Sequence, residues 1–218
     1  MIEARGLTKV YAGDVAALRS VDFTVAAGEF VAVMGPSGSG KSTLLNVVAG
    51  LERPTGGTVR VDGEDLAKLD EVALARHRSK RVGMVFQAFN LLPRFSVVDN
   101  VALPLAFSGV PAAERVRRAR AILDRLGMSA RADHRSNELS GGELQRAAVA
   151  RALIGDPAIL LADEPTGNLD SVNGAALIAL FEELHAQGQT VLLVTHDALI
   201  ASHAQRTISM RDGRVVDG

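Results

Sequence analysis

The chain has 218 residues, of which 47% are hydrophobic and 22% are charged, and its formal net charge is −1. A chain of this length is expected to form a single domain that buries most of its surface, without needing disulfide bonds or a structural metal ion for stability. The absence of cysteine excludes a disulfide framework and a thiolate metal site, and the near-zero charge argues against a nucleic-acid partner held mainly through phosphate contacts.

Membrane-spanning and secretory segments are not indicated. Apolar runs such as residues 31–34 and 175–181 fall far short of the roughly 20 residues that a spanning helix needs. The first eleven residues lack the apolar core of a secretory signal. We therefore expect a soluble chain, whose role at a membrane would come through a partner.

The first half of the chain carries strand signals and one helix signal. Residues 13–14 and 27–28 are turn signals, and residues 41–50 form a predicted helix that Gly50 ends. Alternating or short apolar runs predict strands around residues 2–4, 21–25, 29–35, 56–63 and 81–87.

The middle of the chain, from about Ser96 to Leu153, has helical periodicity. A helix over residues 112–126 is expected to bury Val116, Ala119, Ile122, Leu123 and Leu126 on one face. Its arginines fall largely elsewhere, and we interpret them as a solvated helix face rather than a nucleic-acid patch.

Strands and helices alternate again after Pro157. The pattern predicts a strand over residues 158–164, a helix over 175–186, a strand over 189–197 and a terminal hairpin over 206–218. Alternating elements favour an α/β fold with a mostly parallel sheet, an antiparallel N-terminal β part and an inserted helical subdomain. Residues 1–218 would form one domain, with a core of 1–87 and 155–218 and a helical subdomain of about 88–154.

A phosphate-binding loop follows the strand over residues 29–35. Residues 35–42 read GPSGSGKS, which matches the P-loop pattern, between a buried strand and a helix as the motif demands. Glycines allow the backbone to approach phosphate oxygens, the Lys41 ammonium would reach the β- and γ-phosphates, and the Ser42 hydroxyl would ligate Mg²⁺. A Gly/Ser-rich surface turn is the alternative, which the flanking elements disfavour. The expected nucleotide-binding residues are Gly35, Pro36, Ser37, Gly38, Ser39, Gly40, Lys41, Ser42 and Thr43.

Polar residues end three other predicted strands. Asp163 and Glu164 are expected at the carboxyl edge of the sheet, Asp163 in the magnesium shell and Glu164 as the general base that orients water. His196 would touch the γ-phosphate, and Gln87 would ligate the metal. An acidic turn and a structural histidine are the alternatives for these residues taken singly. Their convergence with the P-loop favours a catalytic site that uses Lys41, Gln87, Glu164 and His196.

A second anion-binding pattern lies a hundred residues beyond the first. Residues 137–148 read NELSGGELQRAA and predict a loop that opens into a helix at Ser140, Gly141 and Gly142. Free backbone N–H groups and the helix dipole attract negative charge at such an end.

Over essentially its whole length the sequence resembles the ATP-binding cassette (ABC) ATPases. Their Walker A, Q-loop, signature, Walker B, D-loop and switch histidine are similar to GPSGSGKST, VFQ, LSGGELQRAAVARAL, ILLADEP, GNLD and VTHD in this chain. The resemblance implies that Tyr11 stacks on adenine and that two copies pack head to tail around ATP and Mg²⁺. Ser140, Gly141 and Gly142 would then grip the γ-phosphate bound to the other copy, and Asp170 would couple the two sites.

A narrower resemblance concerns the branch for lipoprotein release, macrolide export and cell division, in which the ATPase works with an FtsX-like permease. It is carried by FNLLP, NVALPL and ADEPTGNLDS. Ser136 and Leu144 depart from the family pattern, in which proline and glutamine are usual. The resemblance implies an ATPase at the inner, cytoplasmic face of the membrane that energises a permease docked near Phe89, Leu91, Leu92, Pro93 and Phe95.

Three other functions stay open at this point. The chain could be a soluble ABC ATPase that acts on a macromolecule, the ATPase of an amino-acid-type importer, or a module that senses nucleotide without hydrolysing it. Glu164 argues against the last of these, because a sensor needs no general base.

Overall fold

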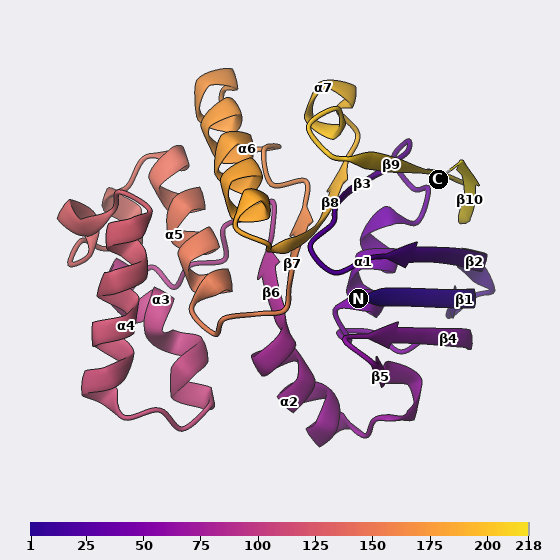
Figure 1. Cartoon of the computed structure of the whole chain (residues 1–218), viewed down its shortest axis with the longest axis horizontal. Helices are drawn as coiled ribbons and strands as arrows, with labels where there is room; N and C mark the ends of the chain where they lie inside the picture. The colour runs from indigo at the N-terminus through magenta and orange to yellow at the C-terminus, as the bar shows by residue number, and fades with distance from the viewer. Residues whose placement is uncertain (218) are drawn as a thin grey trace.

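A six-stranded sheet runs through the middle of the computed structural model, which describes residues 1–217 (Figure 1). The strand order is β10-β9-β3-β8-β7-β6, and every neighbouring pair is parallel except β9 and β10. Its strands are β3 (Phe30–Met34), β6 (Val82–Val85), β7 (Ile159–Asp163), β8 (Thr190–Thr195), β9 (Arg206–Arg211) and β10 (Arg214–Asp217). The prediction of a mostly parallel sheet is confirmed.

A four-stranded antiparallel sheet of order β2-β1-β4-β5 lies beside the first sheet. It contains β1 (Ile2–Tyr11), β2 (Val15–Val25), β4 (Gly56–Val61) and β5 (Glu64–Asp65). Helix α1 (Lys41–Val48) packs its buried Leu44, Leu45, Val47 and Val48 into the apolar cluster that these strands share with the larger sheet. The predicted antiparallel N-terminal part is therefore confirmed.

Three helices gather at one end of the molecule (Figure 1). They are α3 (Val97–Phe107), α4 (Ala112–Arg125) and α5 (Gly141–Leu153), and they enclose an apolar cluster of their own that includes Val101, Leu123 and Ala147. Two 3₁₀ turns, Ser129–Arg131 and Ser136–Glu138, join α4 to α5. The separate cluster supports a helical subdomain, but its limits at about 88–154 stay a prediction.

The three remaining helices lie against strands of the larger sheet, and one further 3₁₀ turn lies against β4 of the smaller sheet. They are α2 (Glu71–Arg81), α6 (Ser171–Ala186) and α7 (Ala198–Ala201), and a 3₁₀ turn spans Leu66–Lys68. Within residues 1–217, none of the helices combines the length and the apolar character that crossing a membrane requires.

Several predicted boundaries were wrong, and two helices, α2 and the short α7, were missed. Helix α2 was not predicted, because it buries only Leu74 and His77 and the rest of its sequence is strongly polar. Strand β6 ends at Val85 rather than at Gln87, and α6 begins at Ser171, where the Asp170 carboxylate accepts a hydrogen bond from the Asn173 N–H. The predicted terminal hairpin forms as β9 and β10, and its last residue, Gly218, lies outside the described residues.

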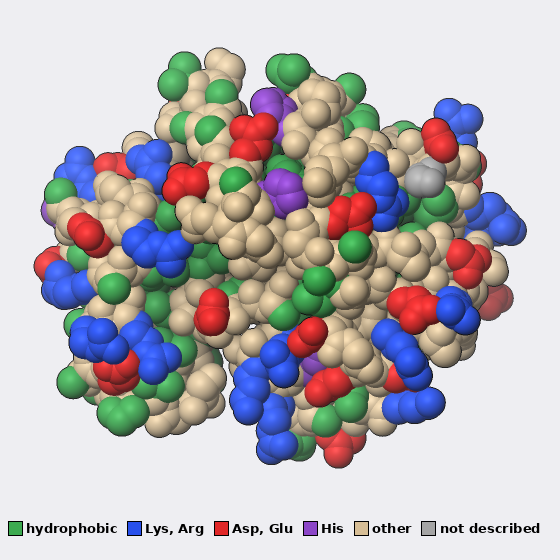
Figure 2. Space-filling model, in the orientation of Figure 1, with side chains coloured by type: hydrophobic (Ala, Val, Ile, Leu, Met, Phe, Trp, Pro, Cys, Tyr) green, Lys and Arg blue, Asp and Glu red, His purple; other side chains and the backbone are tan. Residues whose placement is uncertain are grey.

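Arg117, Arg118 and Arg120 of α4 are exposed, as predicted for a solvated helix face, and they also form ion pairs that were not predicted. Arg117 and Arg118 both form ion pairs with Glu114, at 2.7 and 2.6 Å, and Arg120 pairs with Asp133. Figure 2 shows blue and red side chains lying next to each other over the helices at that end of the molecule. The face of α4 toward the cluster contains the buried Ala119, Ile122 and Leu123.

We predict that Phe181→Ala lowers the free energy of unfolding by about 3–5 kcal/mol. The Phe181 side chain is fully buried between α6 and the sheet, so its removal leaves a cavity. Urea denaturation measures the loss. The matched control is Phe107→Ala, because the Phe107 side chain is 82% exposed, and we expect it to change stability by less than about 0.5 kcal/mol. Equal losses in the two variants would contradict this description of the core.

Candidate active site

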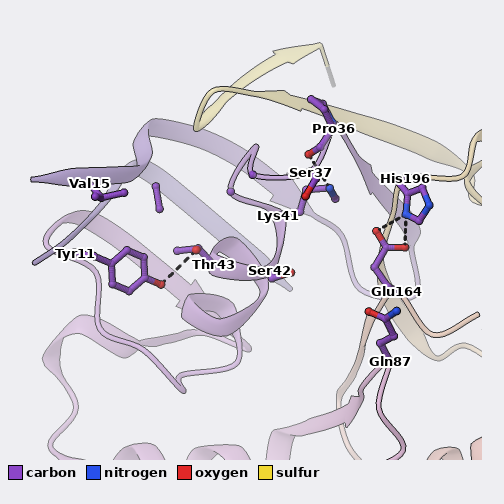
Figure 3. Close-up of a pocket in the computed structure, with 13 residues that line it drawn as sticks. Tyr11, Val15, Pro36, Ser37, Lys41, Ser42, Thr43, Gln87, Glu164 and His196 are labelled. Carbon is purple, nitrogen blue, oxygen red and sulfur yellow. Dashed lines mark hydrogen bonds and ion pairs between the residues drawn. The ribbon is translucent and has the colours of Figure 1, made fainter. Parts of the chain in front are cut away.

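A cavity of about 750 Å³ opens where the strands of the larger sheet end (Figure 3). Loops that follow β3, β6, β7 and β8 contribute to it, together with the first turn of α1 and the hairpin between β1 and β2. The cavity is lined by Tyr11, Val15, Ala17, Pro36, Ser37, Gly38, Gly40, Lys41, Ser42, Thr43, Gln87, Glu164 and His196. The lining therefore brings together Tyr11, most of the phosphate loop, and the predicted catalytic residues Lys41, Gln87, Glu164 and His196.

The loop from Gly35 to Gly40 has a backbone that only glycine can provide at two positions. Gly40 has a φ of 99°, and a Cβ there would lie 2.4 Å from the Ala17 carbonyl oxygen. A Cβ on Gly35 would lie 2.2 Å from the Met210 carbonyl oxygen. Helix α1 begins directly after Gly40, with no side-chain cap and no acidic residue in its first turn. Its first N–H groups are therefore free to bind an anion.

Lys41 holds its ammonium group against this loop. The side chain is largely buried, and Nζ donates hydrogen bonds to the carbonyl oxygens of Gly35 at 2.8 Å and Pro36 at 3.0 Å. Among residues 1–217, the hydrogen-bond partners of this ammonium group are neutral carbonyls alone. It is therefore available to an anionic ligand in the cavity.

Ser42 and Asp163 provide neighbouring oxygen atoms. The Ser42 hydroxyl donates a hydrogen bond of 3.1 Å to Asp163 Oδ1. Burial raises the pKa of the Asp163 carboxyl and the Glu164 charge adds to this effect, whereas the Ser42 hydrogen bond and the Lys41 charge oppose it. A bound cation near Asp163 would favour the charged carboxylate, as the Lys41 charge does.

The Ser42 and Asp163 oxygens are suitable ligands for Mg²⁺, which prefers oxygen ligands and usually keeps several bound waters. Gln87 lines the same cavity and can offer an amide oxygen. Among residues 1–217, no group of three or more His, Asp or Glu side chains could hold a metal ion by itself. Magnesium at this site would therefore depend on phosphate oxygens and water as well as on the protein.

Glu164 and His196 face each other across the ends of β7 and β8 (Figure 3). His196 Nδ1 lies 2.9 Å from both carboxylate oxygens of Glu164. The Glu164 side chain is 16% exposed, whereas the His196 side chain is 71% exposed. Glu164 adopts a left-handed backbone with a φ of 44°, which its N–H bond of 2.9 Å to the Val194 carbonyl holds in place. Such strain in a non-glycine residue is a feature of functional sites.

Gln87 lies in the loop beyond β6, close to the loop that follows β7. Its carbonyl accepts a 2.9 Å hydrogen bond from Asn168 Nδ2, and a Cβ on Gly167 would approach its Nε2 to 2.7 Å. Its side chain points toward Glu164 in Figure 3. The three strand ends predicted to meet the P-loop do so.

Tyr11 stands at the opposite end of the cavity. Its hydroxyl donates a 2.6 Å hydrogen bond to Glu52 and lies 3.3 Å from Thr43 Oγ1, and the Lys9 ammonium lies 5.0 Å from its ring centre. Burial, followed by the hydrogen bond to Glu52, raises the pKa of Tyr11, so the phenol stays neutral at physiological pH. The ring is 38% exposed toward the cavity it lines, and an aromatic base could stack on it.

Four predicted nucleotide-binding residues from the second half of the chain do not line this cavity: Ser140, Gly141, Gly142 and Asp170. The predicted Gly35 and the predicted metal ligand Asp163 are not part of the lining either. Ser140 caps α5, and its N–H donates a 2.8 Å bond to Glu143, which belongs to the same capping box. Gly142 packs so closely on Asn173 that a Cβ would lie 2.1 Å from the amide oxygen. Ser39 is also absent from the lining, since its hydroxyl is buried behind the loop.

Sequence reasoning missed several residues that shape the site. Val15 and Ala17 line the cavity, and Val15 pairs directly with Tyr11 across the β1–β2 hairpin. The turn signal at residues 13–14 could have indicated Val15. Glu52 and Asn173 fix Tyr11 and Asp170 respectively, and no local pattern marks either of them.

Comparison with known proteins adds independent information. Residues 18–167 match a family model described as "ABC transporter". The macrolide export ATP-binding/permease protein MacB of Rhodospirillum rubrum is 50% identical over all of this chain, which spans only 34% of that protein. The dimeric structure of MJ0796, described as a bacterial ABC transporter cassette, is 42% identical with a TM-score of 0.91 and covers 100% of this chain and 97% of its own. A post-hydrolysis structure of that cassette with ADP and Pi is 41% identical and also has a TM-score of 0.91, with the same coverage.

We predict that Gly40→Ala destabilises the protein more than Gly38→Ala does. Both glycines have a left-handed φ, of 99° and 79°, but only a Cβ on Gly40 meets a backbone carbonyl, whereas none of the described atoms lies within 4 Å of one on Gly38. Gly38→Ala should cost about 1–2 kcal/mol for its conformation, and Gly40→Ala should cost more. The midpoints of urea unfolding measure the loss of stability in each variant. Similar losses would show that the contact with Ala17 does not shape the loop.

Proposed function

This chain belongs to the ABC transporter family, and we propose that it binds and hydrolyses ATP to energise a separate membrane permease. The observation that carries the proposal is one cavity in which a phosphate loop, a buried lysine and a glutamate–histidine pair converge with the Ser42 hydroxyl, which is hydrogen-bonded to Asp163. The relative that was solved with ADP and Pi supports hydrolysis rather than binding alone.

Nucleotide would lie along the cavity, with its base on Tyr11 and its phosphates in the loop from Gly35 to Thr43. The free N–H groups at the start of α1 and the Lys41 ammonium neutralise the phosphate charge. Ser42 and Asp163, together with Gln87, would hold Mg²⁺, which polarises the phosphoryl oxygens when it is bound.

Glu164 would act as the general base. Its carboxylate is largely buried at the end of β7 but stays open to the cavity, so it can orient a water molecule and accept its proton. His196 Nδ1 donates to this carboxylate when it carries the proton, which fixes the direction of the carboxylate oxygens. The exposed remainder of the imidazole can reach a terminal phosphate.

The signature residues support a dimeric mechanism. The cavity of the chain itself is not lined by Ser140, Gly141 or Gly142. We therefore infer that these residues contact the nucleotide bound to a second copy. The MJ0796 cassette is dimeric in its solved structure. In a head-to-tail pair, ATP would favour the closed dimer by its higher affinity for that state, and hydrolysis would release it. Asp170, which is hydrogen-bonded to Asn173, would couple the two sites, and Asn173 itself lies against Gly142.

The permease partner is proposed from two observations. The side chains of Leu92 and Phe95 are 42% and 45% exposed in the segment after Gln87 and offer an apolar dock. The MacB relative combines ATP-binding and permease functions in a chain about three times as long. We therefore place this chain in an export system, working at the cytoplasmic face of a membrane through that partner.

We predict that Glu164→Gln lowers ATP turnover by roughly 10²–10⁴, the range expected for loss of a general base, and leaves ATP binding intact. The variant keeps the size of the side chain and should accumulate as an ATP-bound dimer. Steady-state phosphate release and nucleotide titration measure the two effects. Glu182→Gln is a control on an exposed ion pair with His203. Unchanged turnover in Glu164→Gln would overturn the assignment of the base.

We predict that Gly141→Asp abolishes ATP-driven dimerisation but preserves ATP binding by the single chain. The carboxylate would place negative charge against the γ-phosphate of the other copy. Gly141→Ala serves as the size control, because its Cβ would make only ordinary contact, 3.6 Å from Leu169. Light scattering in the Glu164→Gln background measures dimerisation. If the Gly141→Asp variant still dimerises with ATP, the hypothesis that Gly141 contacts the γ-phosphate bound to the other copy is wrong.

A further inference from the structure

The segment between β6 and α3 carries Gln87 at one end and the exposed apolar side chains of Leu92 and Phe95 at the other. It contains no helix or strand, so its conformation depends on side chains from elsewhere. Residues 87–96 thus connect the active-site cavity with the proposed permease dock. The groups that hold this segment decide whether a displacement of the dock reaches the cavity.

Arg151, on α5, holds the segment by its backbone. Its Nη2 donates a 2.9 Å hydrogen bond to the Phe89 carbonyl, and its Nη1 donates to the Asn90 carbonyl. Asn90 has a left-handed backbone with a φ of 52°, which turns its carbonyl into this arrangement. The guanidinium presents two Nη donors in a fixed planar fork, so it holds two successive carbonyl groups in one geometry more rigidly than the freely rotating donors of a lysine ammonium would.

The electrostatics of Arg151 are unusual for a surface-accessible charge. Burial lowers the pKa of its guanidinium, and in the described part of the chain no carboxylate pairs with it. A partly buried cation is unfavourable unless hydrogen bonds compensate it. Here the compensation comes only from carbonyls of the segment, so the charge and the segment conformation stabilise each other.

Asn100 holds the far end of the segment from α3. It is 1% exposed, its Oδ1 accepts a 2.7 Å bond from the Leu92 N–H, and its Nδ2 donates 3.0 Å bonds to the carbonyls of Leu92 and Ser96. Helices α3 and α5 share one apolar cluster. Residues 89–96 are therefore bonded to the helical cluster at both ends.

Gln87 is held from the other side. Its carbonyl accepts from Asn168, which lies in the loop between β7 and α6. The two anchors are thus separated by Ala88 alone: the core holds Gln87, and α5 holds Phe89 and Asn90. This exposed residue is therefore one place at which relative motion of the core and the helical cluster can be absorbed, the other connection being the turn from α5 to β7.

We propose that Arg151 is a positioning residue that fixes the segment after Gln87 to helix α5, so that the dock and the Ser140–Gly142 end of that helix move as one body. Arg151 lies ten residues from Gly141, a distance of about 15 Å along one continuous helix. A partner that displaces the dock would therefore reposition the phosphate-gripping end of α5. This inference rests on the proposed function, because the grip and the dock are parts of it.

The test uses the full chain and exploits its lack of cysteine. A spin label on Ala88→Cys reports the mobility of the segment, and a second label on Arg118→Cys, in α4, gives the distance distribution between segment and cluster. The variants are Arg151→Lys and Arg151→Gln. The matched control is Arg115→Lys, because Arg115 Nη1 also donates to a backbone carbonyl, that of Val110 at 3.1 Å, but within the helical cluster.

We expect both Arg151 variants to make the label at residue 88 mobile and to broaden the distance distribution, with the larger effect in Arg151→Gln. In unlabelled protein, kcat for ATP should fall about 10-fold while KM stays within about 2-fold, because the phosphate loop is untouched. Arg115→Lys should change neither quantity. A purely structural role would lower the melting temperature and leave label mobility and kcat unchanged in the folded variants, and that result would overturn the proposal.

The two proposals fail separately. The label measurements need no nucleotide, so they decide the attachment of the segment even in a chain that does not hydrolyse ATP. If the unsubstituted protein does not hydrolyse ATP, that result contradicts the proposed function instead. A label that stays immobile in both Arg151 variants contradicts the inference alone.

Discussion

The parallel register of β3, β8 and β7 is the constraint on which the site depends. Met34 pairs with Thr195, and Asp163 pairs with Val194, so these strands end at nearly the same level. The next residues along the chain, Gly35, Glu164 and His196, therefore enter their loops side by side. Backbone hydrogen bonds of a fully buried sheet fix this alignment far more rigidly than side-chain contacts could.

Electrostatics then distinguish the two carboxylates at this edge. Asp163 is half-buried beside Ser42 and Lys41, an environment that suits the proposed role in holding a metal ion. Glu164 is turned by its left-handed backbone toward His196 and the open cavity. Two adjacent acidic residues thus have different environments, and in the proposed mechanism this difference would separate metal binding by Asp163 from proton transfer by Glu164.

The helical cluster relates to this edge in two ways. It carries the signature helix α5, whose N-terminus lies outside the cavity of its own chain, and it holds the segment that leaves the cavity at Gln87. Because Arg151 belongs to the same helix as Gly141, the phosphate grip and the exposed apolar segment share one rigid element. In the proposed dimer, a cavity completed by the second copy would thereby respond to events at a distant surface.

The sequence by itself determined the phosphate loop, the strand ends that bear Asp163, Glu164 and His196, and the α/β class, because these depend on local spacing and periodicity. It did not indicate α2, whose polar sequence buries little, or the start of α6, which the Asp170 cap sets. Only the tertiary structure decided that Glu52 anchors Tyr11, that Asn173 lies against Gly142 and that Arg151 binds two carbonyls about 60 residues away. Those partners are distant in sequence, and packing of separate elements brings them together without leaving a pattern in either local stretch.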